Sequence, residues 1–242
     1  MHNLKIQKNW NQISLDQFLE IRRLNREDSI FDYHVDVLCI LTDEDVSYFD
    51  EMQIDELSEI IKEIKWVESE PSRKYKNKID DYVLKPFTKI TLGEFIDLEH
   101  YFSNNYIDHF CHILALLYRR TSKNVYGDDI IEPYNYSPRD RLDWYLDYPI
   151  TDFYGLIPEY IKYKENITKT YSNLLSDVVP DDEVLDDAEE IKEQKREQEK
   201  QKFAWESTIM ALCNDDLSKF NSILDMSVVL VFNILGMKKT LD

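Results

Sequence analysis

The central stretch of the chain, Thr88–Arg120, reads TKITLGEFIDLEHYFSNNYIDHFCHILALLYRR and contains its main helix signals. Its segment Thr91-Leu92-Gly93-Glu94 has the S/T-x-x-E pattern of a capping box, which predicts a helix that starts at Thr91. A second apolar run keeps helical spacing from residue 107 to residue 118. Arg119 and Arg120 close this run, at a place where positive charge favours a helix C-terminus. The stretch therefore predicts two helices with a break between them.

The same helix opening occurs a second time, nearer the N-terminus. Ile13–Leu19 and Ile90–Ile96 both read I-[ST]-L-x-[QE]-F-[LI], and they are 77 positions apart. Each copy is followed by an apolar stretch at helical spacing. The pattern predicts either two related halves, at residues 10–70 and 88–175, or one local solution that is used twice. Two copies are too few to indicate a solenoid.

The remaining segments complete a mainly helical chain with a body at residues 1–178. Residues 74–89 alternate between polar and apolar side chains, which predicts a small β-hairpin, or an extended loop because Pro86 cannot donate to a strand ladder. Residues 179–202 are almost all charged or polar and are expected to form a linker and a long solvated helical arm. Apolar periodicity returns at residues 203–242, which predicts a C-terminal helical hairpin attached to that arm.

Composition excludes several classes of function. The chain of 242 residues has a formal net charge of −19, so phosphate backbones and anionic membranes repel it, and we expect no direct nucleic-acid or membrane binding. With four glycines it has no Gly-rich phosphate loop. Its three cysteines (Cys39, Cys111 and Cys213) are far apart in apolar runs, which predicts buried free thiols in a reducing compartment.

No pattern in the sequence indicates catalysis. His109 and His112 can share one helix face, but a zinc site needs three or four converging ligands, and no H-E-x-x-H motif is present. Cys111 and His112 are adjacent along a helix, so their side chains diverge and cannot form a nucleophile–base pair. We therefore predict a non-enzymatic protein with no metal and no cofactor.

Aromatic and arginine side chains concentrate between residues 119 and 163. Some of these aromatics are expected in the core, and the others are typical of the centre of a protein interface, where aromatics and Arg are enriched. The residues predicted to bind a partner are Arg119, Arg120, Tyr134, Tyr136, Arg139, Trp144, Trp205 and Phe220.

The order of these features resembles the baseplate-hub and tail-assembly-chaperone proteins of large tailed bacteriophages. The resemblance is carried by Ile90–Phe95, by Leu117-Tyr118-Arg119 and by Ile131-Glu132-Pro133-Tyr134, and it spans about residues 9–175. It implies a structural or assembly protein of the virion, tail or head–tail junction. Such a protein binds other phage structural proteins or itself, and works in the host cytoplasm during assembly or in the virion. The resemblance brings no catalytic residues.

A second hypothesis follows from the charge alone. A strongly acidic protein can imitate DNA and occupy the basic surface of a host enzyme, as a host-directed inhibitor or anti-defence protein. The two hypotheses predict different contacts, because a DNA mimic binds in a salt-sensitive way and an assembly protein binds largely through apolar surface.

Overall fold

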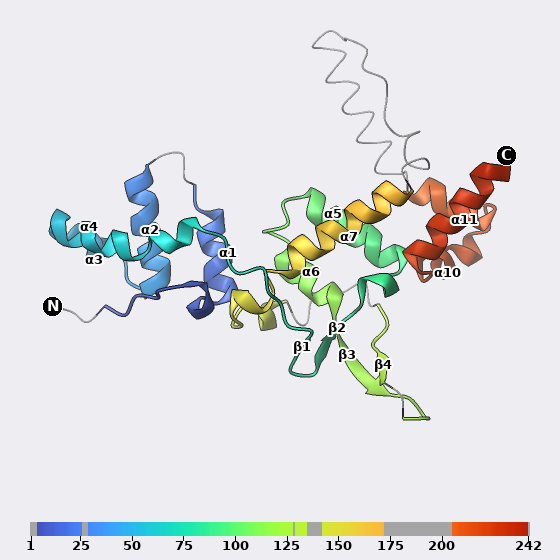
Figure 1. Cartoon of the computed structure of the whole chain (residues 1–242), viewed down its shortest axis with the longest axis horizontal. Coiled ribbons are helices and arrows are strands. Elements are labelled where there is room, and N and C mark those ends of the chain that lie inside the picture. The colour runs from blue at the N-terminus through green and yellow to red at the C-terminus, as the bar shows by residue number, and fades with distance from the viewer. Residues whose placement is uncertain (1–3, 26–28, 128, 135–141, 172–204, 242) are drawn as a thin grey trace, which may run out of the picture. The chain divides into compact units, whose positions relative to one another are not determined.

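The computed structural model describes residues 4–25, 29–127, 129–134, 142–171 and 205–241. The chain is mainly helical, and its described strands form one small antiparallel sheet (Figure 1). The predicted fold class, mainly α with a β-hairpin near residues 74–89, is therefore confirmed. The charged arm expected at residues 179–202 lies outside the described residues.

The chain divides into two compact units, and each is made of two separate parts of the sequence. Unit 1 consists of Met1–Leu84 and Tyr101–Tyr160, and unit 2 consists of Lys85–His100 and Ile161–Asp242. This division differs from the expected succession of body, arm and hairpin. The reason lies in unit 2, where the Phe232 ring contacts both Phe95 and Tyr171, with ring centroids 6.0 and 5.1 Å apart. The C-terminal helices thus pack on segments that come from the expected body.

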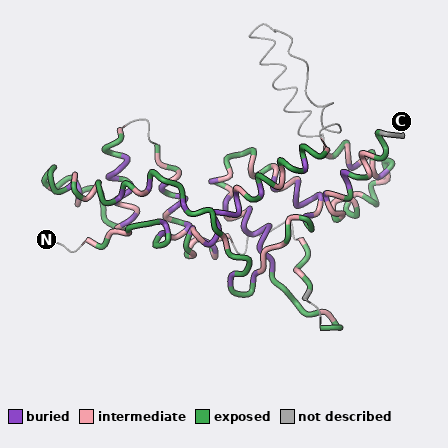
Figure 2. Tube along the Cα trace, in the orientation of Figure 1, coloured by how far each residue is buried: buried purple, intermediate pink, exposed green. Residues whose placement is uncertain are grey.

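Unit 1 holds most of the short elements and the whole sheet. Its elements are η1 (Trp10–Gln12), α1 (Leu15–Arg23), α2 (Ile30–Thr42), α3 (Val46–Asp50), α4 (Ile54–Glu63), η2 (Lys65–Glu68), β1 (Lys78–Ile79), β2 (Tyr82–Leu84), α6 (Phe110–Leu117), β3 (Tyr118–Lys123), β4 (Asp129–Ile131), η5 (Asp143–Tyr145) and η6 (Ile150–Asp152). The core of this unit includes α6, of which Ile113–Leu117 are all buried (Figure 2).

Unit 2 is built from helices alone within the described residues. They are η3 (Phe87–Lys89), most of α5 (Leu92–Ser103), most of α7 (Leu156–Thr170), a helix at residues 205–213, η8 (Leu217–Lys219), α10 (Phe220–Leu224) and α11 (Val228–Leu241). The C-terminal part is thus helical as predicted. None of the helices in the described ranges combines the length and the apolar character needed to span a bilayer.

In unit 1, every backbone N–H group at the start of α1 has a hydrogen-bond acceptor, and the first copy of the repeated motif supplies two of them. The Ser14 hydroxyl accepts from the Gln17 N–H at 3.2 Å, and the Gln17 side chain accepts from the Ser14 N–H at 3.3 Å, which confirms the predicted capping box. The Leu15 N–H donates to the Tyr148 carbonyl at 2.8 Å, and the Asp16 N–H donates to Leu146 at 3.1 Å. These four N–H groups have no partner within a helix, so here a distant segment supplies two of the acceptors.

A matching pair of backbone hydrogen bonds to a distant segment forms in unit 2, at the second copy of the motif. The Leu92 N–H donates to the Met226 carbonyl at 2.8 Å, and the Val228 N–H donates to the Ile90 carbonyl at 3.1 Å. In unit 1 the matching pair is Leu15 to Tyr148 and Ile150 to Ile13, at 2.8 and 3.0 Å. We call each bridge a clasp. Its two outer segments, 146–150 and 224–228, both read L-D-x-x-[IV], and both clasps are isolated antiparallel bridges.

The segment after the unit 1 clasp is tied to the chain that leads into the sheet. The Gly155 N–H donates to the Lys74 carbonyl at 2.8 Å, and the Lys76 N–H donates to the Asp152 carbonyl at 2.9 Å. The Lys76 ammonium also pairs with the Asp152 carboxylate at 2.7 Å. A Cβ at position 155 would come within 2.5 Å of the Arg73 backbone, so this approach requires glycine.

The sheet has the strand order β1-β2-β3-β4, with every neighbouring pair antiparallel. The predicted hairpin at residues 74–89 is β1 and β2, and the sheet extends it by two strands. The apolar run that was expected to stay helical as far as Arg119–Arg120 ends earlier, because Tyr118 already belongs to β3. Pairing of Leu84 with Tyr118, and of Val83 with Arg119, overrides the helical periodicity of the sequence at this point.

The three cysteines are free thiols. Cys213 is buried, as predicted, whereas Cys39 and Cys111 are only half-buried.

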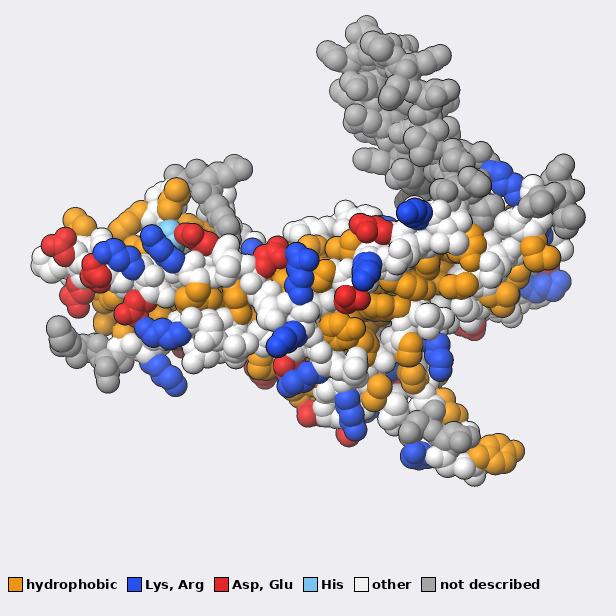
Figure 3. Space-filling view, viewed as in Figure 1, with side chains coloured by type: hydrophobic (Ala, Val, Ile, Leu, Met, Phe, Trp, Pro, Cys, Tyr) orange, Lys and Arg blue, Asp and Glu red, His pale blue; other side chains and the backbone are white. Residues whose placement is uncertain are grey.

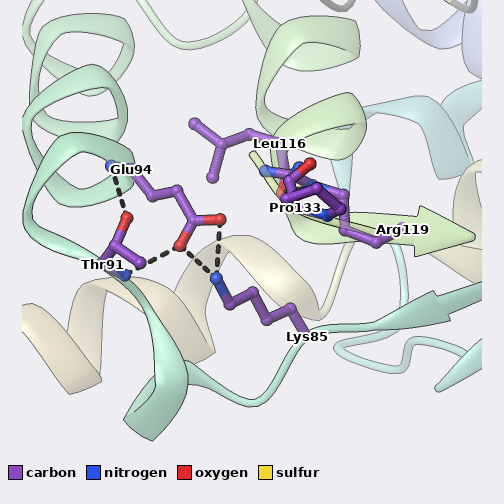
Figure 4. A network of polar contacts seen from close by, with 6 residues as sticks. All are labelled: Lys85, Thr91, Glu94, Leu116, Arg119 and Pro133. Atoms are coloured by element: carbon purple, nitrogen blue, oxygen red, sulfur yellow. Dashed lines mark hydrogen bonds and ion pairs between the residues drawn. The ribbon is translucent and has the colours of Figure 1, made fainter. Parts of the chain in front are cut away.

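The capping box of α5 contains a buried charge whose replacement should destabilise the protein. The Glu94 carboxylate is fully buried and accepts from the Thr91 N–H at 2.8 Å and from the Lys85 ammonium at 2.7 Å (Figure 4). Glu94→Gln keeps the shape but leaves the half-buried ammonium without this counter-charge, which should lower the free energy of unfolding by about 3 kcal/mol. Urea unfolding followed by circular dichroism measures the loss.

A double variant controls for side-chain shape at this pair. Glu94→Gln combined with Lys85→Met removes both charges, so it should recover part of the stability that Glu94→Gln alone loses. If Glu94→Gln is as stable as the native chain, the ion pair does not stabilise this helix start.

Buried tyrosines predict a loss of stability at alkaline pH. Burial raises the pKa of Tyr163 to about 12, with a smaller contribution from Tyr171. An unfolded tyrosine has a pKa of about 10 and so ionises before the folded one, and the free energy of unfolding should fall between about pH 10 and pH 12. Tyr163→Phe cannot ionise and should show a shallower fall. Denaturant unfolding at pH 9–11.5, with tyrosinate absorbance recorded in parallel, tests this, and an equal slope in both proteins would contradict it.

Candidate functional site

The candidate site lies on the sheet of unit 1, where β3 leaves the core. Tyr118 ends α6 and begins β3, and its side chain is fully buried. Its hydroxyl donates to the Lys76 carbonyl at 2.6 Å, and burial raises its pKa above the ordinary value. From Arg120 to Lys123 the strand is exposed, so β3 carries the chain from the interior to the surface within six residues.

Arg119 lies in the interior and connects two backbone segments. It is 1% exposed, its Nε donates to the Leu116 carbonyl at 2.7 Å, and its Nη1 donates to the Pro133 carbonyl at 3.0 Å (Figure 4). The guanidinium also lies 4.9 Å from the centre of the Tyr134 ring. Arg119 therefore holds the segment after β4 against the end of α6.

Arg120 points to the other side and begins a row of aromatic side chains. Its guanidinium lies 5.2 Å from the centre of the Tyr82 ring, and Tyr82 packs on Trp144 with ring centroids 4.7 Å apart. Trp144 packs in turn on Tyr148 at 4.6 Å, and the Tyr148 hydroxyl donates to the Asp80 carboxylate. Trp144 and Tyr148 are half-buried, so the outer end of this row is open to contact.

The hairpin of β3 and β4 ends in two apolar side chains. Its turn is closed by the Gly127 N–H, which donates to the Asn124 carbonyl at 3.0 Å, and Gly127 adopts a positive φ of 86°. At the tip Val125 is 93% exposed and Tyr126 is 87% exposed. Figure 1 shows the hairpin extending away from the helices of unit 1, and Figure 3 shows hydrophobic side chains at its free end, at the lower right.

Exposed basic side chains lie along parts of the sheet, although the chain as a whole is acidic. Arg120 and Lys123 are exposed on β3, and the exposed lysines Lys74, Lys76 and Lys78 alternate along the approach to β1. Acidic side chains lie among them, because Asp80 and Asp81 are exposed in the turn between β1 and β2 and Lys76 pairs with Asp152. Arg120 and Lys123 are the basic residues on the strand that leads to the tip.

The structure brings together part of the set of residues predicted to bind a partner. Arg119 meets Tyr134, and Arg120 meets Trp144 through Tyr82. Trp205 belongs to unit 2, where it packs on Phe95 with centroids 6.0 Å apart. The remaining predicted residues are Phe220, which begins α10 in unit 2, and Tyr136 and Arg139, which lie outside the described residues.

The wider aromatic cluster divides between core and surface. Four of its members are buried in unit 1, namely Tyr145, Phe153, Tyr154 and Tyr160. Val125 and Tyr126 were not among the residues predicted to bind a partner. The available signal was an apolar pair between Asn124 and Gly127, two residues that favour a tight turn.

The histidines of the central stretch lie in an aromatic packing arrangement. His109 stacks on Tyr101 with ring centroids 5.2 Å apart, and His112 lies 5.3 Å from the same ring. Among the residues that the structure describes, no group of three or more His, Cys, Asp or Glu side chains is arranged to hold a metal ion. Burial raises the pKa of the Cys111 thiol to about 11, which disfavours the thiolate needed for nucleophilic attack at neutral pH.

Two neighbouring arginines provide a matched test of this geometry. Arg119→Lys loses the planar fork that reaches two carbonyls at once, so it should lower the free energy of unfolding by about 2 kcal/mol. Arg120→Lys changes an exposed side chain and should cost less than about 0.5 kcal/mol. Chemical denaturation of both variants measures the difference, and equal costs would show that the buried contacts of Arg119 add nothing.

Comparison with known proteins gives no match. No family model, curated protein or solved structure is similar to this chain at the level that counts as a match.

Proposed function

We propose that this protein is a non-enzymatic structural or assembly protein of a tailed bacteriophage, which acts by binding other phage proteins. The observation that carries the proposal is the pair of apolar side chains at the tip of the β3–β4 hairpin, Val125 at 93% and Tyr126 at 87% exposure. Resemblance to the baseplate-hub and tail-assembly-chaperone proteins gives the class of partner.

The hairpin tip has the chemistry of a binding anchor. Turns are usually built from Gly, Pro, Asn, Asp and Ser, so an exposed Val-Tyr pair adds apolar area to water without stabilising the turn. Tyrosine is enriched in the energetic centres of protein interfaces, because it has a large apolar ring and a hydroxyl that can hydrogen-bond. Insertion of Tyr126 into an apolar pocket of a partner accounts for its position.

The two basic residues of β3 describe the rim of that pocket. Arg120 and Lys123 lie on the strand that carries the tip, and both are exposed. A partner with carboxylates around an apolar pocket would be attracted by these charges and would bury Tyr126 at the centre, with the ion pairs at the rim. The half-buried Trp144 and Tyr148 extend the apolar contact along the sheet.

Abundance in purified particles tests the proposed function. The chain is quantified by mass spectrometry in gradient-purified particles of the source phage and in lysate of infected cells. A fixed ratio to known virion proteins, or a complex with phage proteins in the lysate that survives high salt, is the expected result. A complex with a basic host nuclease or repressor that dissociates as salt rises would replace the proposal with the acidic-inhibitor hypothesis.

A double variant tests the role of the hairpin tip. Val125→Ser with Tyr126→Ser should leave the free energy of unfolding within about 0.5 kcal/mol of the native value, since both side chains are exposed. The same variant should lose the phage-protein complex in co-purification from infected cells.

Ile54 provides the matched control for this variant. It is 77% exposed on α4 of the same unit, so Ile54→Ser also removes one exposed apolar side chain. The complex should persist in Ile54→Ser. If the double variant keeps the complex, the hairpin tip is not the binding site.

A further inference from the structure

The agreement between the two units extends beyond the clasps to the turns that lead into them. Tyr148 and Met226, whose carbonyls accept from the two motif helices, each close a turn with their own N–H groups. The Tyr148 N–H donates to the Tyr145 carbonyl at 3.2 Å, and the Met226 N–H donates to the Ile223 carbonyl at 3.1 Å. In both L-D-x-x-[IV] segments the first and third residues are half-buried, the second is exposed and the fifth is buried. The chain therefore enters both clasps through a turn that is closed in the same way.

After each clasp, an aromatic side chain packs on the phenylalanine of the motif. The Tyr154 ring lies against Phe18 with ring centroids 5.8 Å apart and planes at 74°. The Phe232 ring lies against Phe95 with ring centroids 6.0 Å apart and planes at 87°. All four rings are buried, and edge-to-face pairs of this kind stabilise a contact beyond the area that they bury. Both units thus contain the same two backbone hydrogen bonds and the same ring pair.

The equivalent parts keep an almost constant offset along the sequence. Leu92 follows Leu15 by 77 positions, and the short helix η3 before the second motif follows η1 by the same 77. The segment 224–232, which runs from the clasp of unit 2 to its aromatic residue, follows the segment 146–154 by 78 positions. We call these two the return segments. A constant offset is the mark of a repeated stretch of sequence, whereas two unrelated contacts do not share one.

We propose that units 1 and 2 are two copies of one binding module. In each copy the start of the motif helix binds a return segment of one chemical class. That segment begins with Leu-Asp, has an Ile or Val whose N–H donates to the motif, and carries an aromatic residue four positions later. The residue between the two clasp bonds, Pro149 or Ser227, needs no N–H, since its neighbours make both bonds. The two return segments can therefore take each other's place. This inference does not depend on the proposed binding of phage proteins.

Exchange of the clasp sequence in the full-length chain tests the proposal. Met226→Tyr, Ser227→Pro and Val228→Ile together give the second return segment the sequence of the first at the clasp. The variant should keep the circular dichroism of the native chain. Amide hydrogen exchange at the start of α5, measured by mass spectrometry, should stay within about a factor of two of the native rate. The exchange is made in this direction because Tyr148 has further contacts in unit 1.

Proline at two neighbouring positions gives a matched pair of single variants. Ser227→Pro removes an N–H that the clasp does not use, so the start of α5 should remain protected. Val228→Pro removes the N–H that donates to the Ile90 carbonyl, and amide exchange there should become at least about tenfold faster. Val228 is the first residue of α11, a position where a helix tolerates proline, so the loss reports the clasp bond. Ile150→Pro is the mirror variant in unit 1 and should accelerate exchange at the start of α1 instead.

Three results would overturn the proposal. Ser227→Pro could disturb unit 2 as much as Val228→Pro, and the two clasps would then be built differently. The triple variant could lose the protection of α5 while Ser227→Pro keeps it, and each motif would then bind only its own return segment. Native protection in Val228→Pro and Ile150→Pro would show that the clasp bonds do not hold the helix starts. If Val228→Pro unfolds the whole chain, Ser227→Pro and the triple variant still decide, because both should remain folded.

Discussion

The first N–H groups of α1 and α5 donate to backbone carbonyls that lie far away in the sequence, and this requirement organises the whole fold. At the start of α1 the capping box provides two acceptors, and the Tyr148 and Leu146 carbonyls provide the other two. At the start of α5 the Met226 carbonyl has the role of Tyr148. Each clasp thereby fixes the position of a later segment against the start of an earlier helix. The two compact units follow from these two long-range contacts. The element that follows each clasp, η6 or α11, then begins at a defined place against its motif.

The helix start at the clasp of unit 2 contains a buried charge, although the chain as a whole is acidic. The two capping boxes are alike in geometry, but one uses the neutral Gln17 and the other uses Glu94 with Lys85. A carboxylate that is fully buried needs a cation and hydrogen-bond donors together, and this helix start supplies both. Arg119 follows the same logic with backbone carbonyls as acceptors. Buried polar side chains therefore fix the places where helices and strands begin or end. The exposed residues of β3 remain available for contact.

Local patterns in the sequence predict local structure well in this chain, and long-range pairing poorly. Both capping boxes follow directly from residue type and spacing, because the hydrogen bonds involved span three residues. The clasp partners share only L-D-x-x-[IV], a pattern too short to identify a contact across more than a hundred residues. Helical periodicity continues into Tyr118, so it cannot reveal that strand pairing begins there. Arg119 was expected at a partner interface because the sequence does not show which side chains are buried. Its burial depends on two backbone carbonyls that only the folded chain brings near the guanidinium.

The two units alternate along the sequence, and this affects the order in which they can fold during synthesis on the ribosome. Unit 1 lacks its clasp until residue 150 has emerged, and unit 2 lacks its clasp until residue 228 has emerged. The start of α5 must therefore wait for more than a hundred residues of translation before the Met226 carbonyl exists, a delay on the order of ten seconds at elongation rates of about 5–20 residues per second. During that interval its apolar side chains have no native partner from the C-terminal helices. The order of translation thus makes unit 1 complete first, and a nascent chain arrested between the two clasps would carry one finished unit and one unfinished unit.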